Sequence, residues 1–232
     1  MSTLNKNPVM EKITYKIVRS SRRTVSLEIA HDGTIVVRAP HLVSSSRIEG
    51  FIRQKIGWIE RRRADLLSHC ETPVEKRFSH GELFLFQGKS YPLELRPKGK
   101  GAVSLGEAII VPGKHAADPS KAVLAWYKKQ ARALLEERLV FWAAKTGMDY
   151  SMMRLSGART RWGSCTSRGV ISLNWRLVMA PLAVADYVVV HELAHTQVYN
   201  HTPEFWREVA RFVPDYKAKR EWLKKHRAEM MF

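Results

Sequence analysis

The stretch HELAHTQVYNH, residues 191–201, decides how this chain is interpreted. His191 and His195 are four positions apart, which places both side chains on the same face of a helix. Glu192 lies about 100° around the helix from His191, where its carboxylate can hold a water molecule without being a metal ligand. With His201, the stretch offers three imidazoles and one carboxylate at the spacing of a catalytic zinc site. Three protein ligands leave a fourth position for water, which predicts a hydrolase.

The residues before this stretch strengthen the prediction of a metal site. Residues 181–190, PLAVADYVVV, are almost wholly apolar, so we expect a buried helix. A buried helix that ends in two histidines and a glutamate would leave polar groups without partners unless something binds them. An isolated HExxH pattern also arises by chance, and the alternative is a structural histidine cluster that is satisfied within the fold.

The third histidine lies where the chain is expected to turn. Asn200 suits the C-terminal end of a helix, Thr202 suits an N-cap and Pro203 suits a first helical position. We therefore expect His201 at the elbow between two helices. The second helix has an apolar stripe formed by Phe205, Trp206, Val209 and Phe212.

The composition predicts a globular protein. The chain has 232 residues, 45% of them hydrophobic, which is enough for one large domain or two small ones. The two cysteines, Cys70 and Cys165, argue against a disulfide framework and fit a reducing compartment. The N-terminus lacks the apolar segment of a signal peptide, and the apolar run that ends at Val190 is too short to span a bilayer. We expect a cytoplasmic protein with no membrane partner.

The chain is strongly basic, with 39 Lys and Arg against 22 Asp and Glu and a formal net charge of +17. This balance favours polyanionic partners or acidic substrates. Basic residues gather around residues 19–23, 61–63, 96–100 and 217–227. Solvated helix faces explain the second and fourth of these runs equally well, and no DNA- or RNA-binding motif is present. Nucleic acid is therefore one candidate partner of the basic surface, with the C-terminal run as the best contact.

Residues 1–115 are expected to form a mostly β region with one long helix. Alternating polar and apolar residues predict strands at 13–19, 24–30, 34–38, 83–86, 90–95 and 108–111. Asp32-Gly33 predicts a hairpin turn between the second and third of these strands. Ser44 to Ser46 offer an N-cap for a helix that runs to about Cys70.

Residues 116–232 are expected to form the catalytic region. An apolar stripe predicts a long helix from residue 119 to about 146, and a basic helix begins at Pro214. Two strands are predicted near residues 151–159 and 170–177, ahead of the metal-binding helix. Together with the N-terminal strands, these elements predict an α+β fold with a seam near residue 115.

Several motifs of this chain resemble one known family, the YgjP-like zinc metallopeptidases, which are related to SprT-type proteases. The C-terminal motifs are RWGSC (161–165), ISLNWRL (171–177), HELAH (191–195), NH (200–201) and FW (205–206). N-terminal pieces such as RSSRR (19–23) and VRAP (37–40) fit the same pattern, so the resemblance covers nearly the whole chain. It implies a zincin-like fold, with His191, His195 and His201 as zinc ligands and Glu192 as the catalytic carboxylate.

The neighbouring residues are candidates for substrate binding. In zincin-like folds the strand before the metal helix commonly forms the edge along which a peptide lies, and residues 170–177 have that place in the chain. Asn174 and Arg176 can bind substrate there or face water. Arg161 can stabilise an oxyanion, stack on Trp162 or pair with a carboxylate. We expect Cys165 to be a buried thiol, because a fourth protein ligand would close the site.

These observations predict a zinc-dependent metallopeptidase that acts on a protein or peptide substrate. Zn²⁺ and Glu192 would activate a water for attack on a peptide carbonyl, and Glu192 would pass the proton to the leaving amine. The first alternative is a metal-dependent hydrolase of nucleotides, which the positive charge favours although no Gly-rich phosphate loop is present. The second is a basic nucleic-acid-associated protein whose metal site is secondary.

Overall fold

The computed structural model describes residues 14–29, 34–61, 75–115 and 118–232. The chain divides into two units, residues 1–71 and residues 72–232. This boundary differs from the seam expected near residue 115. The strands between residues 83 and 112 belong to the second unit, because Phe84 and Leu93 share one buried core with Val123 of the long helix.

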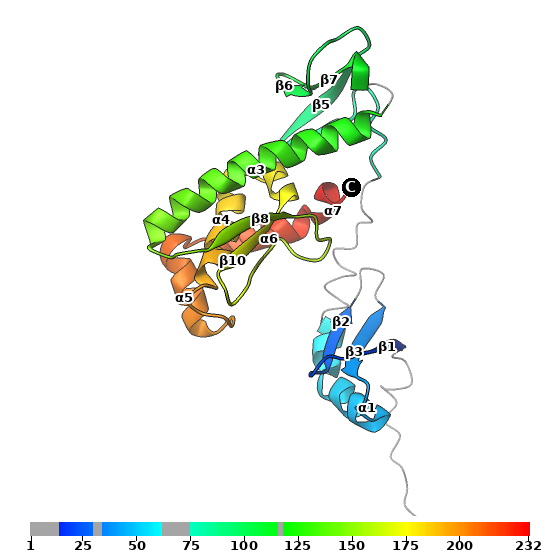
Figure 1. Cartoon of the computed structure of the whole chain (residues 1–232), viewed down its shortest axis with the longest axis vertical. Helices are drawn as coiled ribbons and strands as arrows, with labels where there is room; N and C mark the ends of the chain where they lie inside the picture. The colour runs from blue at the N-terminus through cyan, green and yellow to red at the C-terminus, as the bar shows by residue number, and fades with distance from the viewer. Residues whose placement is uncertain (1–13, 30–33, 62–74, 116–117) are drawn as a thin grey trace, which may run out of the picture. The chain divides into compact units, whose positions relative to one another are not determined.

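The first unit contains a three-stranded sheet and a helix. Its elements are β1 (Tyr15–Ser20), β2 (Ser26–Ile29), β3 (Ile35–Pro40) and α1 (Ser45–Gln54) (Figure 1). The strand order is β1-β3-β2, with β1 parallel and β2 antiparallel to β3. The three predicted strands are confirmed, and the turn predicted at Asp32-Gly33 lies outside the described residues.

Every second side chain of β3 faces the core of the first unit. Ile35, Val37 and Ala39 are buried, and they share a cluster with Ile48 and Ile52 of α1. The helix that was expected to reach residue 70 is interrupted at Lys55, whose N–H bonds to the carbonyl of Ile52. Residues 56–61 are helical again, and the rest of the predicted helix, with Cys70, lies outside the described residues.

One arginine of the basic run at residues 19–23 has a structural role. The Arg19 guanidinium donates to the carbonyls of Pro40, His41 and Val43 at 3.2, 2.9 and 2.7 Å. It therefore closes the loop that leads from β3 into α1. All three bonds come from Nη1, so Nε and Nη2 of this exposed guanidinium are not used in them.

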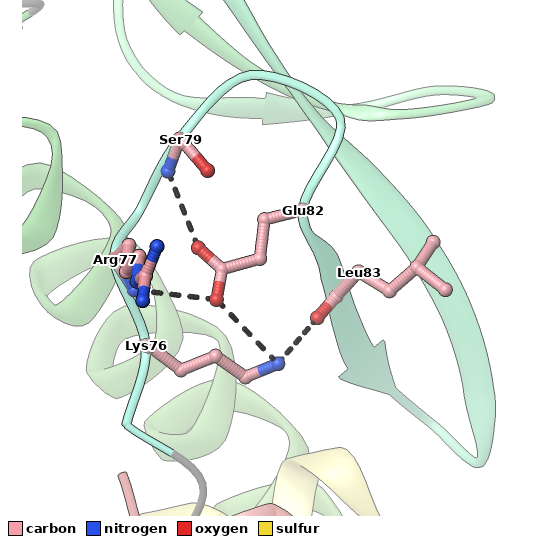
Figure 2. A network of polar contacts seen from close by, with 5 residues as sticks. All are labelled: Lys76, Arg77, Ser79, Glu82 and Leu83. Atoms are coloured by element: carbon pink, nitrogen blue, oxygen red, sulfur yellow. Dashed lines mark hydrogen bonds and ion pairs between the residues drawn. The ribbon is translucent and has the colours of Figure 1, made fainter.

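Polar contacts of Glu82 and Lys76 hold the loop that leads into the first sheet of the second unit (Figure 2). The Glu82 carboxylate accepts hydrogen bonds from the backbone N–H groups of Arg77 and Ser79 at 3.3 and 3.2 Å, and it lies 3.9 Å from Lys76 Nζ. Lys76 Nζ also donates to the carbonyl of Leu83 at 2.7 Å. One carboxylate thus satisfies the backbone of its own turn, which fixes where the following strand begins.

The first sheet of the second unit has four strands in the order β4-β5-β7-β6. They are β4 (Leu83–Phe86), β5 (Lys89–Arg96), β6 (Ser104–Leu105) and β7 (Ile109–Pro112). β5 and β7 are parallel, whereas β4 is antiparallel to β5. In the β4–β5 turn, the backbone N–H groups of Gln87 and Gly88 donate to the carbonyls of Val178 and Met179, both at 2.8 Å. This sheet is therefore joined directly to the segment that precedes the histidine motif.

The long helix α3 (Pro119–Thr146) organises the core of the second unit (Figure 1). Asp118 caps its N-terminus by accepting from the N–H of Lys121, and Gly147 ends it with a φ of 71°. The Tyr127 hydroxyl donates to the carbonyl of Leu85 at 2.6 Å, which ties the helix to β4. The helix packs mainly against two segments, Trp175–Met179 and Leu182–Ala194.

A second, three-stranded sheet has the order β8-β10-β9 and consists of β8 (Met152–Ser156), β9 (Gly163–Cys165) and β10 (Val170–Asn174). The strand predicted at 170–177 ends at Asn174, where the 3-10 helix η3 (Trp175–Met179) begins. The expectation that this strand forms an edge was wrong. β10 lies between its two neighbours, and the edge beside it is β9, which runs antiparallel to β10.

Four helices complete the chain: α4 (Leu182–Ala194), α5 (Pro203–Phe212), α6 (Tyr216–Lys225) and α7 (Arg227–Met230). α4 is buried along nearly its whole length, as its apolar sequence predicted. The Arg138–Asp186 ion pair, with Nε–Oδ1 and Nη2–Oδ2 distances of 2.6 and 2.9 Å, joins α3 to α4. Within the described ranges, no helix is long and apolar enough to cross a membrane.

Candidate metal centre and active site

The HELAH helix and the following turn bring three histidines together. His191 and His195 come from the C-terminal end of α4, and His201 comes from the turn before α5. One nitrogen of each ring lies within 4.8 Å of the other two. His191 Nε2 and His201 Nε2 are 3.0 Å apart. The predicted cluster is therefore present as a three-sided group of imidazoles.

The turn that delivers His201 is built as the sequence suggested. α4 ends at Ala194, and the Thr196 hydroxyl donates to the carbonyl of Leu193 at 2.8 Å. The Thr202 side chain then caps α5 by accepting from the N–H of Phe205. His201 lies between these two helix ends, at the expected elbow.

Contacts around the rings fix how the histidines point. His195 Nδ1 lies 3.1 Å from the carbonyl of Val198, so a proton on Nδ1 leaves Nε2 as the ligand atom. Phe205 stacks on His195 with ring centroids 4.4 Å apart, and Trp206 stacks on His201 at 5.5 Å. Both aromatic residues belong to the apolar stripe predicted from the sequence, and this stripe forms a wall of the histidine cluster.

The electrostatic surroundings favour neutral imidazoles. Burial, together with the neighbouring His195 and His201, lowers the pKa of His191 to about 3. The pKa of His201 is also lowered, again chiefly by burial. A metal binds the neutral form of imidazole, so both rings are in the ligating form at neutral pH.

Glu192 lies beside the cluster but is not one of its ligand groups. It is only 5% exposed, and among the described residues its Oε2 atom has no hydrogen-bond partner. Burial raises the pKa of Glu192 to about 8, and the charge of Arg161 opposes that shift. A buried carboxylate without a donor is unfavourable, so this atom calls for a water or a cation that protein atoms do not supply.

The glycine of the RWGSC motif makes room for this carboxylate. A Cβ on Gly163 would lie 2.6 Å from Glu192 Cγ and 2.7 Å from Glu192 Cδ, well inside normal contact distance. The requirement is for space, since Gly163 has no positive φ. Edge strand β9 therefore packs directly on Glu192, a neighbour that the sequence alone did not reveal.

Cys165, two residues further along β9, lies on the same side of the strand as Gly163. Burial and the charge of Glu192 raise the pKa of its thiol. It is a free cysteine outside the histidine cluster, and its side chain is partly buried. The structure thus places it near the carboxylate without making it a fourth ligand.

Asn174 has a structural place rather than the expected position on a substrate edge. It is completely buried, and its Nδ2 donates to the carbonyls of Ala158 and Arg161 at 2.6 and 3.0 Å. Its Oδ1 accepts from the N–H of Arg176 at 3.1 Å. Neither alternative of the sequence analysis, substrate contact or exposure to water, describes this residue. It fixes the loop that leads into β9.

Arg176 is likewise buried, with 7% of its surface exposed, because it lies in η3 and not in a strand. Its guanidinium stacks over Trp175 at 4.4 Å and donates to the carbonyls of Gly157 and Phe232 at 3.5 and 3.3 Å. The predicted substrate contact is therefore replaced by internal contacts. Arg161, in contrast, is exposed, and its charge acts on Glu192.

Comparison with known proteins agrees with this geometry. The family model described as YgjP-like, metallopeptidase domain, matches residues 23–226. The chain belongs to the YgjP-like metallopeptidase family. No curated protein and no solved structure matches the chain. The family resemblance expected from the motifs is thus confirmed over both units.

The residues of this YgjP-like domain fit a divalent metal ion. Tetrahedral zinc with bonds of about 2.0–2.1 Å would separate two ligand nitrogens by roughly 3.3 Å, and the two Nε2 atoms of His191 and His201 are 3.0 Å apart. The unpartnered Oε2 of Glu192 lies on a side chain next to this group. A metallopeptidase domain implies a metal, and the three histidines offer a complete set of protein ligands for one.

Replacing Gly163 by Ala should damage chemistry and spare metal binding. The new methyl group must displace the buried Glu192 side chain, and a shift of about 1 Å at a catalytic group can cost on the order of a hundredfold in rate. We expect hydrolysis of a peptide substrate to fall by about that factor with unchanged metal content. The control is Gly50→Ala, since a Cβ there meets nothing within 4 Å. Equal activity in both variants would contradict the role of Gly163.

The buried carboxylate should leave a pH signature in metal-free protein. The pKa of Glu192 is raised from 4.5 to about 8, so between these values the folded state keeps a proton that the unfolded state releases. Stability should therefore fall, by on the order of a few kcal/mol, as pH rises through this window. Denaturant midpoints measured with a chelator across this pH range should show a smaller fall in Glu192→Gln. The same pH dependence in both proteins would argue against an unpartnered buried Glu192.

Proposed function

We propose that this chain is a zinc-dependent peptidase in which His191, His195 and His201 hold the ion and Glu192 is the general base. The observation that supports it best is the buried carboxylate of Glu192 beside three clustered imidazoles, in a chain of a metallopeptidase family. Three nitrogen ligands leave a coordination position for a reacting group, as in catalytic zinc sites.

When bound, zinc would supply a Lewis acid for the peptide carbonyl and lower the pKa of water. Glu192 would accept a proton from the attacking water and then donate it to the nitrogen of the leaving amine. Its surroundings suit this exchange, because Glu192 is buried and its Oε2 atom has no hydrogen-bond partner among the described residues. Gly163 keeps the carboxylate in place by packing on it, and the exposed Arg161 is a candidate for contact with the substrate carbonyl oxygen.

Strand β9 is the better candidate for the peptide-binding edge. Trp162 O and Thr166 N bond to β10, so the N–H and C=O groups of the alternate residues Gly163 and Cys165 point away from β10. An extended peptide can pair with such groups as an added strand. This edge replaces residues 170–177 in the proposal, because β10 is enclosed by β8 and β9.

The two alternatives rest on the positive charge. Hydrolysis of nucleotides would use the same metal site, and nucleic-acid binding would use the basic C-terminal helix. Part of that helix is already used within the fold: Lys219 pairs with Asp215 at 2.7 Å, and Arg227 donates to the carbonyl of Arg159 and lies over Trp162. Peptide hydrolysis therefore remains the function that we propose, in a cytoplasmic protein.

Replacing Glu192 by Gln separates metal binding from chemistry. Gln has nearly the same shape and is not needed as a ligand, so zinc content should stay at about one ion per chain. Loss of the base should lower the rate of peptide hydrolysis by roughly a hundredfold or more. Glu107→Gln, an exposed glutamate in the loop before β7, is the matched control. Turnover like that of the control in Glu192→Gln would exclude Glu192 as the base.

Replacing His201 by Ala tests the ligand set. Two remaining histidines hold zinc poorly, so we expect at least about a tenfold loss of zinc affinity, measured by competition with a chromogenic chelator. His41→Ala, an exposed histidine of the first unit, should bind zinc like the unaltered protein. Full occupancy of His201→Ala at the same free zinc concentration would remove this residue from the site.

A further inference from the structure

Three exposed arginines come from three different segments of the second unit. Arg161 lies in the loop before β9, Arg168 lies in the turn between β9 and β10, and Arg220 lies in α6. All three are exposed, and no ion pair joins any of them to an acidic residue in the described part of the chain. Glu192, on which the charge of Arg161 acts, is buried. The three arginines are therefore positive charges without an acidic ion-pair partner among the described residues.

Arg220 and Arg161 act on different groups of the site. The Arg220 guanidinium lies 5.7 Å from the centre of the Trp206 ring, and that ring stacks on His201. Its charge reaches both His191 and His201. The charge of Arg161 acts on Glu192, and Asn174 holds the Arg161 carbonyl. Both the histidines and the glutamate therefore lie in the field of a cation.

Arg168 lines a cavity of about 390 Å³ beside the end of β9. The cavity lies between residues 149–151, residues 166–169 and the turn after His195, which contributes Thr196, Gln197 and Tyr199. Most of its lining residues carry a hydroxyl or an amide group, which suits a polar side chain. Arg168 is its one cation and Asp149 its one acid.

The direction of β9 places this cavity on the N-terminal side of a bound peptide. Gly163 packs on Glu192, and Thr166, three residues later, already lines the cavity. Three residues of strand span roughly 10 Å. A peptide that pairs antiparallel to β9, as β10 does on the other side, would have its N-terminal residues at the cavity and its reacting bond near Glu192.

We propose that this cleft selects extended peptides with acidic side chains, Asp or Glu, on the N-terminal side of the reacting bond, and that Arg168 binds one of these carboxylates in the cavity. The proposal rests on the proposed peptidase function and adds its substrate class. A carboxylate matches the donor geometry of a guanidinium, and the hydroxyl of Ser167 adds a further donor. Asp149 works against this preference, so its removal should strengthen acidic ligands.

A peptide suits this surface better than a nucleic acid does. The outward N–H and C=O groups of Gly163 and Cys165 alternate donor and acceptor, which matches a polypeptide backbone. A phosphodiester backbone offers acceptors only and would leave the strand's carbonyls unmatched. Single-stranded DNA is therefore the competing ligand in the test.

The test measures binding and does not depend on turnover. Fluorescently labelled decapeptides that carry Glu, Gln or Lys at the N-terminal positions are titrated into zinc-loaded Glu192→Gln protein, with anisotropy as the readout. We expect the Glu peptide to bind at least fivefold more tightly than the Gln peptide, with a smaller difference at high salt. Adding Arg168→Gln should abolish the preference, and adding Asp149→Asn should increase it. Arg154→Gln, an exposed arginine of β8, is the matched control.

Equal binding of the Glu and Gln peptides, or a preference that survives Arg168→Gln, would overturn the proposal. So would a single-stranded oligonucleotide that binds more tightly than the Glu peptide and loses its affinity with Arg168→Gln, because the cavity would then be a phosphate site. Hydrolysis of the same peptides by the unaltered protein is measured separately. Acid-selective binding without any hydrolysis would refute the peptidase function and leave the cavity assignment intact.

Discussion

The close packing of α4 against β9 is the constraint on which the candidate site depends. α4 is apolar around its circumference, so the fold buries it, and its last turn carries Glu192 into the interior with it. Burial is tolerable there only because Gly163 has no side chain and because the neighbouring histidines can hold a cation. The packing that stabilises the core therefore also places a buried glutamate beside three clustered imidazoles. One oxygen of this glutamate has no hydrogen-bond partner among the described residues.

Much of this structure serves to place β9 correctly. The Asn174 amide uses both donors and its acceptor to join the loop before β9 to η3, and the β4–β5 turn bonds to the end of η3. The stacked rings of Phe205, Trp206 and Tyr216 support the histidines from the opposite side. The site is thus built from segments that are distant in sequence and rigidly connected by satisfied polar groups.

The sequence predicted the parts of the site that depend on local spacing. The helix period placed His191 and His195 together, and cap residues placed His201 at an elbow. Sequence could not show which strand lies at the sheet edge, because strand order depends on long-range pairing; β9, only three residues long, gave no periodic signal. For the same reason, the polar residues Asn174 and Arg176 were expected to contact substrate or water, although their partners across the fold bury both.

The division of the chain into two units affects how the protein should respond to its metal. Each unit has its own hydrophobic core, and the three histidines all belong to the second. Free energy from ligand binding enters only the cooperative segment that contains the ligands. The second unit is therefore the one that bound metal stabilises directly. In a thermal profile of the whole chain, the transition of the second unit would shift with ion concentration.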